Sequence, residues 1–177
     1  CVLLDAPFAA YANSEKLPLP IATAELKSWD KMHPLLRNGQ AAPGAPLGVG
    51  ANPGKMMYMD EARTKISFMP GFFQMDSIGY NAGKIQAENN SLSWGDLFNP
   101  KYRGKVAMYG IDWLGMLNAA MGMQALGIFK PVDMSSMTEK EVDTVILFLK
   151  DKKKEGHFRA MWKAYGELVN LMASEEV

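Results

Sequence analysis

The sequence is poor in cysteine, in net charge and in long hydrophobic runs. Its 177 residues include one cysteine, Cys1, so an internal disulfide is excluded. No apolar run reaches the roughly 18 residues that a membrane-spanning helix needs. Basic and acidic residues number 19 each, which argues against a nucleic-acid binder dominated by a basic face. This balance leaves room for a local acidic pocket that binds a small ligand.

Signals of catalysis are also scarce. The two histidines are His33, which has no metal-ligand partner at a useful spacing, and His157, which lies among Lys and Arg residues. Neither a Gly-x-Ser-x-Gly nor a His-Glu-x-x-His motif occurs. The run GVGANPG at 48–54 lacks the Gly-Lys-Ser/Thr ending of a phosphate loop and the spacing of a dinucleotide site. The sequence therefore predicts that the chain is not an enzyme and uses no cofactor.

The composition and the residue patterns are those of a globular α/β protein. Hydrophobic residues make up 48% and charged residues 21%, which excludes a disordered chain. Thr138 and Glu141 form a capping box, which predicts the start of a helix. Residues 23–36 are expected to form a modest helix or an irregular turn, and 38–55 a loop. Strands are expected at 1–5, 56–59, 64–69, 78–80 and 106–109, and helices at 9–16, 114–126, 139–154 and 158–172.

Several stretches together resemble one protein family. They are Pro70, SIGYN at 77–81, SWGDLF at 93–98, PKYRGKV at 100–106, and the segments 157–162 and 169–174. In order and spacing they resemble the periplasmic solute-binding proteins of bacterial ABC importers, in particular the spermidine/putrescine-binding branch. The resemblance covers most of the chain, whereas residues 38–66 match poorly.

The resemblance implies a periplasmic binding protein type II-like fold, with parts of two α/β lobes that contain mixed sheets and are joined by a hinge. Residues 1–69 would be the C-terminal part of lobe 1, and residues 70–177 would be lobe 2, incomplete at its C-terminal side. The chain is therefore expected to be an internal piece of a longer protein. The family usually has glycine where Glu175 stands, and its absence disfavours a tight turn there.

The resemblance also implies a solute site in a cleft between the lobes. Aromatic candidates come from a strand end and from the segment that crosses between the lobes, and their rings would attract ammonium groups. Carboxylate candidates lie in the second lobe. The candidates are Phe8, Tyr11, Phe72, Phe73, Asp76 and Asp112.

Each candidate also has a purely structural interpretation. Phe8 and Tyr11 would pack against a sheet, and one of the two residues 72 and 73 would belong to the core between the lobes. Asp76 would be a solvent-exposed turn residue, and Asp112 would cap the helix that follows it.

The expected function is capture of a small, polyamine-like cation for an ABC importer. The partners would be the solute and the permease subunits, with no nucleic acid, in the periplasm or on the outer surface of a Gram-positive cell. Gly110 and Gly115 stand where a second carboxylate would be expected, which leaves room for a smaller amine or a neutral solute. The alternatives are a ligand-sensing domain of the same fold, or a binding protein for a different small organic solute.

Overall fold

The computed structural model describes residues 6–40, 42, 44–45, 56–71, 76–87, 91–134 and 136–177. The chain divides into two compact units, Cys1–Met75 and Asp76–Val177, so the observed boundary lies slightly after the predicted one between residues 69 and 70. Both units combine helices with very small sheets, which places the protein in the mixed α/β class. The strand expected at 1–5 lies outside the described residues, as does most of the loop expected at 38–55.

Unit 1, Cys1–Met75, is built from short elements around a two-stranded antiparallel sheet. Ile21 of β1 pairs with Ile66 of β2, and Ile66 also forms an isolated antiparallel bridge with Tyr58. Of the strands expected at 56–59 and 64–69, the second is present as the short β2, whereas the first is reduced to the single bridge at Tyr58. Met57, Tyr58 and Ile66 are buried, and Trp29 packs edge-on against Tyr58 at 6.3 Å between ring centroids. The elements are α1 (Ala6–Ser14), β1 (Ile21–Ala22), 3-10 turns at Thr23–Glu25 and Trp29–Lys31, α2 (Pro34–Asn38) and β2 (Lys65–Ile66).

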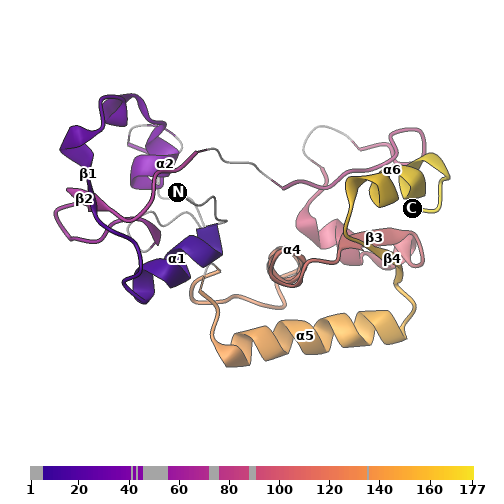
Figure 1. The fold of residues 1–177 in the computed structure, drawn as a ribbon. Helices are drawn as coiled ribbons and strands as arrows, with labels where there is room; N and C mark the ends of the chain where they lie inside the picture. The colour runs from indigo at the N-terminus through magenta and orange to yellow at the C-terminus, as the bar shows by residue number, and fades with distance from the viewer. Residues whose placement is uncertain are drawn as a thin grey trace. The chain divides into compact units, whose positions relative to one another are not determined.

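Unit 2, Asp76–Val177, contains a parallel pair of strands connected through two helices. Val106 of β3 is in register with Phe158 of β4, and Tyr109 is in register with Trp162. Parallel strands need a long crossover, and here α4 and α5 supply it. Figure 1 shows α5 and α6 on opposite sides of this strand pair. The elements are 3-10 turns η3 (Trp94–Phe98) and η4 (Pro100–Tyr102), then β3 (Val106–Tyr109), α4 (Asp112–Ala125), α5 (Glu139–Lys154), β4 (Phe158–Trp162) and α6 (Tyr165–Ala173).

The core of unit 2 forms where α4 meets η3, β3 and α5. Phe98 is 3% exposed and lies against Gly122 of α4, where an added Cβ would be 2.4 Å from the ring. His157 is also buried, with its Nε2 2.7 Å from the carbonyl oxygen of Leu97. The buried apolar residues are Phe98, Val106, Met108, Ala119, Ala120, Met123, Met134 and Val145. The glycine therefore allows a closer approach of η3 to the helix than any side chain would.

Three predicted elements of unit 2 are confirmed. The strand at 106–109 is β3, and the helix at 114–126 is α4, which begins two residues earlier and is followed by Gly127 at φ +72°. The capping box starts α5, because Glu141 accepts a hydrogen bond from Thr138 N at 2.7 Å and Glu141 N donates to Thr138 Oγ1 at 3.3 Å. Lys152, Lys153 and Lys154 occupy the last turn of this helix, where positive charge is favoured by the helix dipole.

The predicted helix over 158–172 is wrong in its first part. Residues 158–162 form strand β4, in which Phe158 and Trp162 are partly buried while Arg159 and Met161 are exposed. This alternation has the period of a strand, and β3 supplies the hydrogen-bonding partner. Helix α6 begins only at Tyr165. Glu167, in its first turn, accepts hydrogen bonds from the backbone N–H groups of residues 163 and 164, which directly precede the helix.

The strand predicted at 78–80 is also wrong. Residues 76–87 contain no strand, and the carbonyl oxygen of Asn81 accepts hydrogen bonds from the N–H groups of Lys84 and Ile85 in a turn. Alternating side chains suit a pleated, half-buried surface. Such a segment forms a strand only where another strand pairs with it.

Candidate functional site

Strands β3 and β4 are parallel, so their carboxyl ends meet at one edge of unit 2. At this edge Gly110 N donates a hydrogen bond of 2.7 Å to the carbonyl oxygen of Trp162. The ring of Tyr109 stacks on Trp162 at 4.4 Å between centroids, and Tyr165 lies 6.1 Å from Trp162. Tyr165 is 76% exposed. The edge therefore presents a row of three aromatic rings, one of which faces solvent.

Asp112 lies at the same edge, three residues after the end of β3. It is the first residue of α4, while Ile111 occupies the N-cap position and makes no side-chain capping bond. The capping role considered for Asp112 is therefore wrong. Its side chain is exposed, and within the described part of the chain the carboxylate has no hydrogen-bond or ion-pair partner. A negative charge in the first turn of a helix is favoured by the helix dipole.

The other predicted site residues are distributed over both units. Phe8 and Tyr11 lie one turn apart on α1 in unit 1, and their exposed fractions of 55% and 64% argue against the alternative that both pack against a sheet. Asp76 is exposed at the start of unit 2. Phe72 and Phe73 lie outside the described residues. A solute-binding role for these residues stays a prediction.

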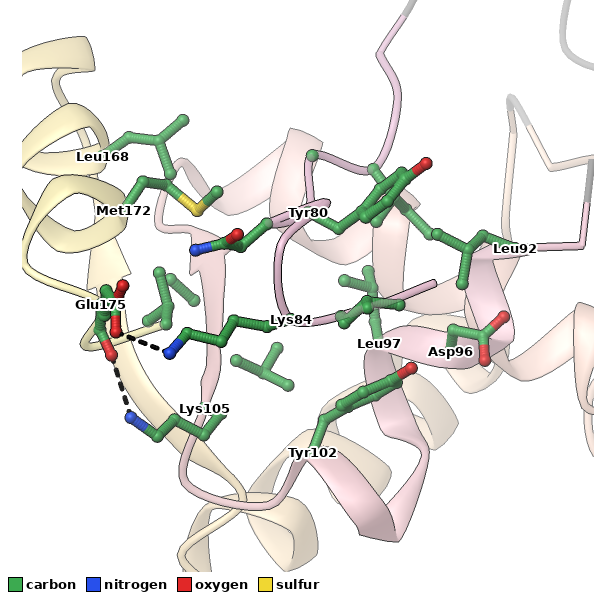
Figure 2. Close-up of a pocket in the computed structure, with 17 residues that line it drawn as sticks. Tyr80, Lys84, Leu92, Asp96, Leu97, Tyr102, Lys105, Leu168, Met172 and Glu175 are labelled. Atoms are coloured by element: carbon green, nitrogen blue, oxygen red, sulfur yellow. Dashed lines mark hydrogen bonds and ion pairs between the residues drawn. The ribbon is translucent and has the colours of Figure 1, made fainter. Parts of the chain in front are cut away.

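Unit 2 also contains a cavity of about 400 Å³ that the sequence did not predict. Its walls come from residues 78–85 and Leu92, from η3, η4 and the start of β3, and from the end of α6 onward. Leu168 and Met172 of α6 face Tyr80 across the cavity (Figure 2). Of the predicted site residues that the structure describes, Phe8, Tyr11, Asp76 and Asp112, none lines it. The stretches 77–81 and 93–98, chosen for the family resemblance, do contribute to its walls.

Three charged residues meet at one side of this cavity. Lys84 Nζ lies 2.9 Å from the carboxylate of Glu175, and Lys105 Nζ donates a 3.0 Å hydrogen bond to the backbone carbonyl oxygen of Glu175. The hydrogen bond from Lys84, together with its charge, lowers the pKa of the Glu175 carboxyl below its ordinary value. Asp96 lies on the other side (Figure 2), where its carboxylate accepts a 2.8 Å hydrogen bond from Ser93 N.

A tight turn forms at Glu175, although the absence of glycine at this position was expected to disfavour it. Glu175 adopts φ +55°, the left-handed conformation that glycine usually provides after a helix. Glu175 N donates to the carbonyl of Met172 and Glu176 N donates to that of Leu171, which closes the end of α6. The turn therefore forms with a non-glycine residue, and this places the Glu175 carboxylate beside Lys84.

None of the described helices has the length and apolar composition needed to cross a membrane. Among the residues that the structure describes, no three His, Cys, Asp or Glu side chains gather as a metal site would require. The chain was also compared with protein families, curated proteins and solved structures. No family model, no curated protein and no solved structure matches it.

Proposed function

We propose that the chain is the solute-binding component of an ABC importer, with a periplasmic binding protein type II-like fold, and that it captures a small polyamine-like cation without catalysis. The observation that carries the proposal is the exposed carboxylate of Asp112, three residues after the end of β3, at the edge of β3 and β4 that also holds Tyr109, Trp162 and the exposed Tyr165. Ligands of open α/β sheets bind outside the carboxyl ends of the strands. The division into two α/β units is also what a two-lobed binding protein would have.

The chemistry of this edge suits an ammonium group. A carboxylate forms strong, charge-assisted hydrogen bonds with an ammonium N–H. The face of an aromatic ring adds attraction of about 0.5–2 kcal/mol per contact, depending on how far the pair is desolvated. Asp112 supplies the charge, and Tyr165 and Trp162 supply the rings. A diamine would need a second acidic or aromatic group, for which Asp76, Phe72 and Phe73 are the proposed sources.

The proposed role also implies partner proteins and a location outside the cytoplasmic membrane. The solute would be handed to the permease subunits of the importer, and the protein would work in the periplasm or on the outer surface of a Gram-positive cell. A solute changes the conformation of its binding protein only by as much as its affinities for the two states differ. No bond of the solute is made or broken in this role.

Calorimetric titration with putrescine and spermidine, at low and moderate salt, tests the proposal. Asp112→Asn keeps the shape of the side chain and removes its charge, so we expect the affinity to fall about tenfold. Tyr165→Leu removes the ring face, and we expect a loss of about threefold. Asp143→Asn on the exposed face of α5 is the matched control and should bind as the natural protein does.

Two results would contradict the proposal. One is a folded protein, verified by circular dichroism, that shows no saturable binding of either amine. The other is binding that Asp112→Asn and Asp143→Asn weaken equally, since the effect would then come from net charge and not from the edge of β3 and β4.

A further inference from the structure

The cavity in unit 2 has mostly apolar walls. Aliphatic side chains come from all three of its wall segments, among them Ile78, Leu97, Val106 and Leu168. Its volume of about 400 Å³ falls in the range of small-molecule sites. An apolar body that enters such a cavity is removed from water, and each buried methylene group raises the affinity by about a factor of four. The walls therefore favour a ligand whose larger part is a hydrocarbon.

One side of the cavity carries an excess of positive charge. Two ammonium groups, those of Lys84 and Lys105, converge on Glu175 (Figure 2), but only Lys84 bonds to its carboxylate. Lys105 bonds to the neutral backbone carbonyl of the same residue. Two positive charges thus share one negative charge at this side. Asp96 lies across the cavity and already accepts a hydrogen bond from the backbone N–H of Ser93.

We propose that this cavity is a second binding site, which takes an amphipathic molecule with one carboxylate and an unbranched hydrocarbon body, such as a medium-chain fatty acid. Its carboxylate would receive hydrogen bonds from the ammonium groups of Lys84 and Lys105. Its hydrocarbon chain would lie among the aliphatic walls. The site is formed within unit 2 and does not depend on the proposed polyamine site or on its ligand.

Glu175 would compete with such a ligand, because its carboxylate already occupies Lys84. Both side chains are more than half exposed, so solvent weakens their ion pair and a ligand carboxylate can displace it at modest cost. The low pKa of Glu175 keeps this competitor ionised at neutral pH. Removal of its charge is therefore expected to strengthen binding of the acid, whereas removal of either lysine charge weakens it.

Titration of the full chain with octanoate, hexanoate and octan-1-ol, followed by calorimetry, tests the site. Octanoate should bind about tenfold more tightly than hexanoate, because two more methylene groups are buried in a partly open cavity. It should bind about fivefold more tightly than the uncharged alcohol, which lacks the charge-assisted hydrogen bonds.

Variants with opposite expected effects make the test specific. Lys105→Met and Lys84→Met keep most of the side-chain volume and should each weaken octanoate binding about fivefold. Glu175→Gln should strengthen it about threefold, since it frees Lys84. Lys153 is exposed on α5 and does not line the cavity, so Lys153→Met should leave the affinity for octanoate unchanged. Circular dichroism verifies that each variant is folded.

Equal affinities for octanoate and octan-1-ol would overturn the proposal, and so would the absence of saturable octanoate binding to the folded protein. Weaker binding by Glu175→Gln would overturn it as well, because the ligand would then need that carboxylate. Asp112→Asn should leave octanoate binding unchanged, so failure here is distinguishable from failure at the amine site.

Discussion

Replacement of Gly122 by alanine tests the packing that holds unit 2 together. An alanine Cβ at this position would lie 2.4 Å from Cε2 of Phe98 and 2.9 Å from the carbonyl oxygen of Trp94. Ordinary contacts between carbon atoms are about 3.5–4.0 Å, so the phenyl ring would have to move by more than about 1 Å.

The ring of Phe98 has little room to make that movement. It is 3% exposed and packs edge-on against Phe148 at 4.9 Å and Phe158 at 6.3 Å between centroids. Overpacking of this kind costs about 1–3 kcal/mol, and more where backbone atoms are also hit. The greater helix propensity of alanine returns about 1 kcal/mol. We therefore expect a net loss of about 2 kcal/mol in the free energy of unfolding.

Urea unfolding followed by far-ultraviolet circular dichroism measures this loss, and thermal unfolding should show a fall in Tm of roughly 10 °C. Gly166→Ala is the matched control, because no atom lies within 4 Å of its added Cβ on α6. That variant should be as stable as the natural protein or slightly more stable. If Gly122→Ala proved equally stable, the contact between α4 and η3 would not be as close as described.

Two further predictions concern single carboxylates. Hydrogen bonds from the backbone N–H groups of Thr138 and Val132 lower the pKa of the Glu141 carboxyl below its usual 4.5. The ionised carboxylate therefore stabilises the fold above that pH, and this stabilisation is lost as the pH falls through the folded-state pKa. Glu141→Gln should therefore flatten the fall of Tm below about pH 4.5, and an equal effect of Glu139→Gln, on the same turn of α5, would contradict this cause. Glu175→Gly should raise Tm, because glycine adopts φ +55° without the strain of a side chain and the exposed ion pair with Lys84 contributes little. Glu175→Gln removes the same charge without gaining that freedom, so an equal rise in both variants would refute the conformational explanation.

The helix ends that the sequence predicted correctly depend on neighbours in the chain. The capping box of α5 is complete within residues 138–141, and α4 ends where Gly127 supplies a positive φ. Such signals act over a few residues, so they can be recognised without knowledge of the fold.

The errors concern strands, whose formation depends on distant partners. Residues 158–162 carry apolar side chains that fit a helical face, yet they pair with β3, more than 40 residues earlier in the chain. Residues 78–80 have a strand pattern, yet the structure describes 76–87 without a strand. In both cases the pattern of side chains is compatible with two structures, and the available backbone partner selects one.

The candidate sites divide in the same way. Asp112 was predicted as a site residue from the family resemblance, and the structure places it at the start of α4 with an exposed side chain. The aromatic row beside it forms only because β4 brings Trp162 into register with Tyr109. The cavity near Lys84 was not predicted at all, since Lys105 and Glu175 come from segments far apart in the chain.

The sequence by itself determined the mixture of helices and strands, the capping box of α5, the end of α4, and the scarcity of catalytic and disulfide-forming residues. Local hydrogen bonds, backbone conformations and residue chemistry are enough for those conclusions. The tertiary structure alone decided that 158–162 is a strand, that Asp112 shares an edge with three aromatic rings, and that two lysines meet at Glu175. These features arise from pairing and packing between distant segments, which residue order along the chain does not specify.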